Sequence, residues 1–343
     1  MGAGKKPDSQ RRTNKSAKTK TSSTKNRGKH TQLDQKAVEH FIGTTICKKG
    51  LAQLITDFKR HPRICDMAKC TVFSRNQKLN RYKDVGCLDN NRVRVQGINE
   101  DEYIHANYVP TLKCPKRFIC TQAPINETCA DFWAMIMQEE VKVILMLCDM
   151  REQGKIKCAN YFPAAKGETT TFGDFTVTCE LEKEFVSPSK TPANIKHLIM
   201  KVTKEGGAQH TVNHYHWVSW PDRSVPPADL VTVELLEKVN ETTKPIVIHC
   251  SAGVGRTGSV VMLQMALEML ADGQMVDMEA LLVQIRESRA NSVQTAVQYL
   301  FVHEVLLNMF RVRGKMDKAF FERHQVFLEK YAAAIAAELQ QGT

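Results

Sequence analysis

The sequence lacks the features that would place the protein in a membrane or outside the cell. No apolar run reaches the roughly 20 residues of a membrane-spanning helix, and the N-terminal segment has no signal-peptide core. No C-x-x-C pair occurs among the 11 cysteines, which argues against zinc ribbons and thioredoxin-like redox sites. We therefore expect a soluble, cytoplasmic protein with reduced thiols and with neither a metal nor a cofactor.

Acidic and apolar residues are nearly absent from the first 30 positions. This segment holds ten lysines and arginines and one acid, whereas the rest of the chain has 38 basic and 36 acidic residues. Such a composition cannot offset chain entropy by burial, so we predict a disordered basic tail over residues 1–32. The tail could keep the protein soluble, bind an anionic membrane, nucleic acid or another acidic partner, or serve as a nuclear address. The nearly neutral remainder is not expected to bind nucleic acid.

The rest of the chain alternates between helical and strand patterns. The predicted strands cover 103–109, 117–121, 141–147, 154–162, 172–182, 195–204, 210–220 and 245–249. The predicted helices cover 33–60, 127–140, 230–239, 258–270, 278–289 and 293–311. This mixture predicts an α/β domain with a largely buried central sheet over residues 33–311. An Ala-rich segment then predicts a helical extension over residues 312–343.

One stretch combines a strand, a glycine-rich loop and the start of a helix: "IVIHCSAGVGRTGSVV", beginning at Ile246. Backbone N–H groups in such a loop, together with a helix N-terminus, bind phosphate and other oxyanions. The match to a nucleotide-binding P-loop fails, because Ser259 stands where that motif needs lysine. The pattern therefore predicts an oxyanion cradle without a nucleotide.

The cradle contains a thiol and a guanidinium. Cys250 lies beside the helix N-terminus, which lowers a thiol pKa and favours the reactive thiolate. Arg256 can present two parallel donors to two phosphoryl oxygens, and the Thr257 hydroxyl can stabilise the thiolate as a leaving group. A lone cysteine after a strand would suggest a buried structural thiol. The arginine six residues later favours a phosphate site with a nucleophile at its floor.

The stretch "VIHCSAGVGRTG" resembles the signature loop of the protein tyrosine phosphatases. Further motifs follow in the order and spacing of that family, so the resemblance covers roughly residues 36–310. They are "LNRYKDV" (79–85), "YIHANYV" (103–109), "TQAP" (121–124), the segment 131–163, "WPDRSVP" (220–226) and "VQTAVQY" (293–299). The resemblance implies a highly twisted mixed β-sheet flanked by α-helices, with a strand–phosphate loop–helix active site.

The resemblance also implies a mechanism. Cys250 would attack phosphorus and form a phosphocysteine, while Arg256 would hold the non-bridging oxygens. Asp222 would act as general acid and then as general base. Gln294 would position the hydrolytic water, with support from Gln298. The phosphate would also contact the loop backbone at Ser251, Ala252, Gly253, Val254 and Gly255.

The remaining implied roles concern substrate and support. Tyr82 would stack on the substrate ring and line a deep slot, which favours phosphotyrosine proteins as partners, and Asp84 would fix the peptide. Lys157 would contact Asp222 on loop closure. Two supporting roles complete the set: Glu152 would pair with Arg256, and His249 would support the thiolate. We expect a monomer.

The sequence departs from the family pattern at several positions. Ser224 replaces a glycine of the acid loop, which predicts slower loop closure. Asn291 replaces a small residue at the rim, which predicts narrower access. The other departures are Leu79, His105 and Ala123. Two alternatives stay open beside a competent tyrosine phosphatase. They are an impaired pseudophosphatase that only binds phosphotyrosine, and a phosphatase of broader range acting on phosphoserine or phosphoinositides.

Overall fold

The computed structural model describes residues 1–2, 33–218 and 220–316, with scattered positions between 319 and 337. Residues 3–32 of the predicted tail lie outside the described residues. No helix in the described part is long and apolar enough to cross a bilayer.

The centre of the molecule is a mixed sheet of nine strands in the order β1-β2-β3-β11-β4-β10-β9-β8-β7. Its members are β1 (Arg92–Arg94), β2 (Tyr103–Thr111), β3 (Cys114–Thr121), β4 (Val143–Met146), β7 (Thr169–Phe172), β8 (Phe175–Glu184), β9 (Ile195–Lys204), β10 (Gln209–Trp217) and β11 (Ile246–His249). The four strands β3, β11, β4 and β10 run parallel, and the outer pairs are antiparallel. A separate hairpin joins β5 (Arg151–Glu152) to β6 (Lys155–Ile156).

Strand β11 lies at the centre of the parallel region. It pairs with β3 on one side and β4 on the other, and all four of its residues are buried. A continuous apolar strand is typical of a position covered on both faces. Ligands of open α/β sheets bind beyond the carboxyl ends of such strands, so the segment after His249 is placed for binding.

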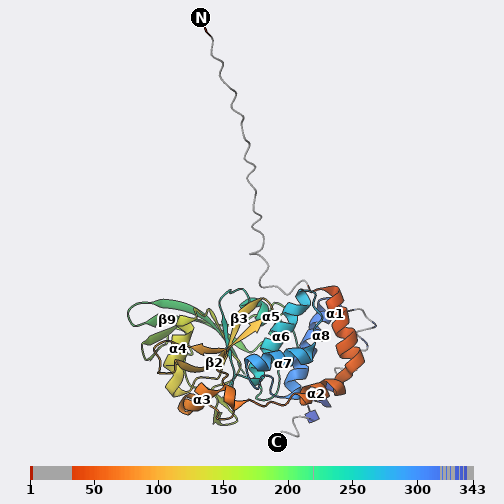
Figure 1. Cartoon of the computed structure of the whole chain (residues 1–343), viewed down its shortest axis with the longest axis horizontal. Helices are drawn as coiled ribbons and strands as arrows, with labels where there is room; N and C mark the ends of the chain where they lie inside the picture. Colours follow the sequence, from red (N-terminus) through yellow and green to blue (C-terminus); the bar gives the residue numbers. More distant parts are fainter. Residues whose placement is uncertain are drawn as a thin grey trace.

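The longer helices lie mainly on one side of this sheet. Figure 1 shows α1, α2, α6, α7 and α8 gathered together, with α4 apart from them against β7 and β8. The helices are α1 (Gln35–Phe41), α2 (Gly50–Arg60), α3 (Thr71–Arg75), α4 (Cys129–Gln138), α5 (Val231–Val239), α6 (Gly255–Ala271), α7 (Met278–Ser288) and α8 (Ala296–Val312). A π-helical segment (Ile42–Lys49) joins α1 to α2. Helix α6 is buried along almost its whole length, so it forms the core behind the phosphate loop.

The predicted twisted mixed sheet with flanking helices is confirmed. The strand predicted over 154–162 is wrong beyond the short β6 strand. Gly154 has φ 76° and turns the β5–β6 hairpin, and the chain then leaves regular pairing to bring Tyr161 into the core. Sequence patterns also missed the short elements α3 and β1, since five and three residues are too few to show a period.

The segment after α8 continues with helical positions. The described positions between 319 and 337 are helical, and Tyr331 is buried in the main core. This part of the extension therefore docks on the domain. The domain boundaries at 33, 311 and 312 stay predictions.

Candidate active site

The loop after β11 is shaped by close backbone packing. Gly253 has φ +68°, and a Cβ placed there would lie 1.9 Å from the Thr121 carbonyl oxygen at the end of β3. Only glycine fits this position, because both the left-handed backbone and the close approach exclude a side chain. The Ser251 carbonyl accepts a hydrogen bond from the Ala123 N–H at 2.9 Å. These contacts fix the loop between the strand end and α6.

Cys250 lies at the floor of this loop and is 3% exposed. Burial raises the pKa of Cys250, but the Arg256 charge and hydrogen bonds from Thr257 and the Gly253 N–H outweigh burial and hold the pKa below its usual value. The buried Thr257 hydroxyl has no other partner among the described residues, so it is available to the sulfur. The geometry therefore favours a thiolate.

Arg256 is 2% exposed and makes a two-pronged contact with Glu152. Its Nη1 and Nη2 lie 2.6 and 3.1 Å from the two Glu152 carboxylate oxygens, as predicted for this pair. Nη1 also donates to the Trp220 carbonyl at 2.9 Å, and Nη2 lies 3.2 Å from Asp222 Oδ1. The guanidinium is therefore oriented by one carboxylate and faces a second one across the cradle.

The acid loop is closed over the cradle. Asp222 Oδ2 accepts a hydrogen bond from Lys157 Nζ at 2.7 Å, the contact predicted for closure. Burial raises the pKa of Asp222, but the Lys157 hydrogen bond and the Arg256 charge outweigh burial and keep the pKa below its usual value. The left-handed residue of this loop is Arg223, at φ 56°, whereas Ser224 has no positive φ. The closed loop therefore does not need glycine at Ser224.

The two glutamines lie against the phosphate loop. A Cβ on Gly255 would lie 3.0 Å from Gln294 Oε1 and from both side-chain atoms of the Gln298 amide. Gln298 Oε1 accepts from the Gln294 N–H at 2.8 Å. Thr295 caps α8, and its hydroxyl donates to the Arg223 carbonyl at 3.2 Å. The glutamine loop therefore contacts both the cradle and the closed acid loop.

Tyr82 forms one wall of the site. Its hydroxyl lies 2.8 Å from Ser251 Oγ, and Ser251 Oγ donates to the Lys157 carbonyl. Asp84 lies farther out and is exposed, and its carbonyl accepts from Asn291 Nδ2 at 3.4 Å. Asn291 thus bridges the glutamine loop and the loop that carries Tyr82. Ala252 and Val254 complete the cradle, and Val254 is the N-cap of α6.

His249 lies behind the cradle within a buried chain of hydrogen bonds. Its Nδ1 lies 3.1 Å from the Cys250 carbonyl oxygen, and its Nε2 lies 2.8 Å from the Tyr161 hydroxyl. That hydroxyl is also 2.7 Å from His214 Nε2. Burial lowers the pKa of His249 to about 3, so the ring is neutral and orients the Cys250 backbone.

Arg289 is a site residue that sequence reasoning missed. It is fully buried, and it donates to the Gly253 carbonyl from Nε and to the Ala252 carbonyl from Nη2, each at 3.1 Å. Its other contacts are Asn107 Oδ1 at 2.8 Å and His105 Nδ1 at 3.1 Å. By holding carbonyls on the outside of the loop, Arg289 directs the amides inward. Only its three-dimensional position reveals this role, since "SRANS" has no local signature.

We expect Arg289→Met to lower the free energy of unfolding by about 2–4 kcal/mol, because it leaves buried acceptors without their charged donor. The measurement is the urea midpoint, together with kcat/KM, which should fall with the loop displaced. Arg94→Met on an exposed arginine is the control and should change neither. Unchanged activity in a folded Arg289→Met protein would contradict the positioning role.

The comparisons with known proteins agree with this geometry. Residues 76–308 match the family model described as protein-tyrosine phosphatase. Receptor-type tyrosine-protein phosphatase C of Rattus norvegicus is 35% identical over 279 residues, which cover 79% of this chain and 21% of that protein. Phosphatidylinositol phosphatase PTPRQ of Homo sapiens is 30% identical over 270 residues, covering 77% and 11%. The chain thus spans about a fifth or less of the length of these relatives.

Solved structures show the same fold. A structure of PTPN18, from work on HER2 tyrosine phosphorylation sites, superposes with a TM-score of 0.70 at 28% identity and covers 80% of this chain and 99% of that one. PTPN18 in complex with HER2 phosphopeptides gives a TM-score of 0.68 at 26% identity, with the same coverage. Both the sequence motifs and the folded site therefore lead to one assignment: the chain belongs to the protein-tyrosine phosphatase family.

Proposed function

We propose that the chain hydrolyses phosphotyrosine in proteins through a phosphocysteine intermediate. The observation that carries the proposal is the arrangement of three groups in one closed cradle. A thiol with a lowered pKa lies below Arg256, and Arg256 lies 3.2 Å from the Asp222 carboxylate. A nucleophile, a phosphate-binding cation and an acid thus share one small space.

In the first step the Cys250 thiolate attacks phosphorus and the bond to the phenolic oxygen breaks. Arg256 and the amides of the loop hold the three non-bridging oxygens as negative charge spreads over them. Asp222 gives its proton to the leaving phenolate oxygen. A bound phosphate dianion engages Arg256 and so removes one cause of the lowered pKa of Asp222. The pKa of Asp222 therefore rises when the substrate binds, and the carboxyl can carry the proton that the first step needs.

In the second step water attacks the phosphocysteine. The Asp222 carboxylate accepts a proton from that water, the phosphorus–sulfur bond breaks, and inorganic phosphate and the thiolate are released. Gln294 and Gln298, which lie against Gly255, are placed to orient the water. The Thr257 hydroxyl stabilises the departing sulfur.

Phosphotyrosine is the substrate class that the walls of the site support. Tyr82 is joined to Ser251 at the cradle's edge, so the substrate side chain must pass this ring before it reaches the sulfur. A phosphoserine is too short for such a path. A phosphoinositide would need cationic groups for its further phosphates, and no lysine lies between Ser251 and Gly255. Cytoplasmic location, the monomeric state and the partner of the basic tail stay predictions.

The test is phosphate release from three matched substrates: a phosphotyrosine peptide, its phosphoserine counterpart and a phosphatidylinositol phosphate in vesicles. We expect the phosphotyrosine peptide to be preferred in kcat/KM by at least about 10²-fold, since the other two cannot place phosphorus at the sulfur. Comparable rates for the lipid would contradict the proposal and indicate a phosphoinositide phosphatase. Binding of the phosphotyrosine peptide without release would favour a pseudophosphatase.

The pH profile tests the state of Asp222. The first step needs a protonated Asp222, so kcat/KM falls as pH rises through the pKa of this group in the free enzyme. Lys157→Met removes the hydrogen bond that most lowers this pKa, and the alkaline limb of kcat/KM should therefore move to higher pH. Lys155→Met, on an exposed residue of the same hairpin, is the control. An alkaline limb that stays in place would show that another group sets it.

A further inference from the structure

A pair of cysteines outside the cradle lies in direct contact with the substrate loop, the segment 79–86 that carries Tyr82. Cys65 Sγ and Cys70 Sγ are 3.5 Å apart, and Cys70 is the N-cap of α3. A Cβ on Gly86 would lie 2.5 Å from Cys65 Sγ and 2.8 Å from Cys70 Sγ. Both sulfurs thus pack on the backbone of Gly86, two residues after Asp84. We propose that Cys65 and Cys70 form an oxidant-sensitive dithiol, which a peroxide converts to a disulfide.

The two thiols differ in the way that such a reaction requires. The contact between the two thiols lowers the pKa of Cys65 to about 7, although burial acts in the opposite direction. The same contact and burial raise the pKa of Cys70. Cys65 is therefore the more readily ionised of the two thiols. One thiol is the nucleophile, and the other can resolve the product.

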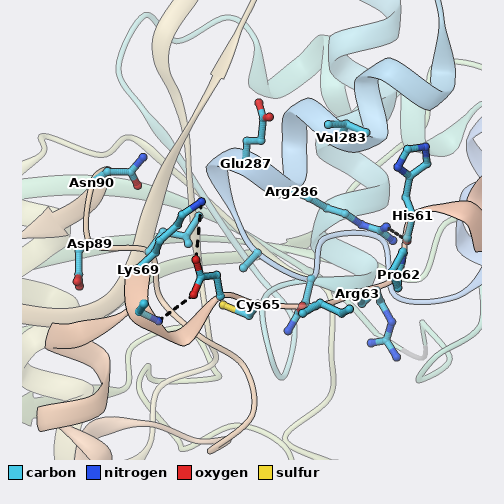
Figure 2. Close-up of a pocket in the computed structure, with 16 residues that line it drawn as sticks. His61, Pro62, Arg63, Cys65, Lys69, Asp89, Asn90, Val283, Arg286 and Glu287 are labelled. Atoms are coloured by element: carbon cyan, nitrogen blue, oxygen red, sulfur yellow. Dashed lines mark hydrogen bonds and ion pairs between the residues drawn. The ribbon is translucent and has the colours of Figure 1, made fainter.

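Access of solvent to Cys65 distinguishes this pair from a second pair of nearby thiols, Cys148 and Cys158. Cys65 is half-buried and lines a pocket of about 910 Å³. Figure 2 labels Cys65 among the residues that line this pocket. Cys148 and Cys158 also lie near each other, but both are buried, and burial raises the pKa of Cys148 well above its usual value. An oxidant in solution can therefore reach Cys65 through the pocket, whereas the inner pair is shielded.

The reaction balances with hydrogen peroxide as the oxidant. The Cys65 thiolate attacks one peroxide oxygen, the oxygen–oxygen bond breaks, and the hydroxide that leaves takes up a proton to form water. Cys65 is then a sulfenic acid. Cys70 gives up its proton and attacks the Cys65 sulfur, which releases a second water. The sulfurs must approach by about 1.5 Å to reach disulfide length.

The consequence for the substrate loop rests on the proposed function. The loop is tied to α3 at its start, since Asn80 Nδ2 donates to the Phe73 and Asn76 carbonyls, and it contacts the dithiol at its end through Gly86. Closure of the disulfide draws the two sulfurs together against Gly86, which moves Gly86 and shifts Tyr82 from its position beside Ser251. We therefore expect the disulfide to weaken phosphotyrosine binding by about 3- to 10-fold.

The test uses the full chain with Cys250→Ser, so that the catalytic thiol does not react. After hydrogen peroxide treatment, free thiols are alkylated and the protein is digested with trypsin, which cleaves after Arg63, Lys69 and Arg75. The disulfide then appears as the hexapeptides 64–69 and 70–75 joined together, and reduction separates them. Cys70→Ala should prevent the joined species and leave a Cys65 sulfenic acid that dimedone traps. Cys47, an exposed thiol, is the internal control. Absence of the joined pair at doses that oxidise Cys47 would overturn the proposal.

Binding of a phosphotyrosine peptide to the same Cys250→Ser protein tests the coupling. We expect weaker binding after oxidation, restored by reduction, and no such change when Cys65→Ser is added. Unchanged affinity in protein that carries the disulfide would overturn the coupling to the substrate loop. A reduced protein that binds no phosphotyrosine peptide would count against the proposed function instead, because disulfide formation is read by mass and does not depend on it.

Discussion

Cys250→Ser is expected to lower turnover of a phosphotyrosine peptide on the order of 10⁴–10⁶-fold while binding is retained. The site lowers the pKa of a thiol by the charge of Arg256 and by hydrogen bonds from Thr257 and Gly253. A serine hydroxyl starts from a far higher pKa, so the same groups cannot ionise it. Phosphate contacts from the loop amides and Arg256 do not involve the sulfur and should remain.

Two measurements separate chemistry from binding in this variant. Steady-state phosphate release gives the loss of turnover, and calorimetric titration with the peptide gives the affinity. Cys114→Ser is a matched control, since this thiol lies in β3 away from the cradle, and it should leave both quantities unchanged. Residual turnover in Cys250→Ser within about tenfold of the wild type would refute the nucleophile assignment.

Some parts of the site can be predicted from the sequence, and others cannot. The cradle was predictable because its residues are contiguous: Cys250, the glycines and Arg256 lie within one strand–loop–helix segment. Asp222 and Tyr82 came from the order of motifs along the chain. Residues that act through contacts between distant segments could not be found in this way. Arg289 and His105 meet at the cradle although 184 positions separate them, and no local pattern reports that contact.

The way in which a segment is buried also decides whether its secondary structure can be predicted from the sequence. The central strands β4 and β11 are continuous apolar runs, and their bounds were predicted to within two residues at each end. The segment 154–162 contains apolar and aromatic residues as well, but they are buried for a different reason. Tyr161 is held by Trp133, whose Nε1 donates to the Tyr161 carbonyl at 2.8 Å, and the part of the segment after β6 pairs with no strand among the described residues. Periodicity cannot distinguish burial in a sheet from burial beneath one.

Asp222→Asn is expected to lower kcat for a phosphotyrosine peptide by about 10²–10⁴-fold with little change in KM. The amide keeps the shape of the side chain, and its one oxygen can still accept from either Lys157 or Arg256, but it cannot protonate a phenolate. The loss should be smaller with p-nitrophenyl phosphate, because its leaving group needs less protonation. The alkaline limb of the pH profile should disappear in the variant, since the group whose deprotonation causes it is gone.

The comparison of the two leaving groups is the discriminating measurement. Asp229→Asn is the matched control on the same segment, where the carboxylate accepts from the Val231 N–H at 2.9 Å and an amide oxygen can do the same. It should leave kcat and the pH profile unchanged. Equal losses for both substrates in Asp222→Asn would indicate a disturbed loop instead of a missing proton. In that case the acid must be sought elsewhere, because Lys157 and Arg256, the charged groups in contact with Asp222, both have raised pKa values.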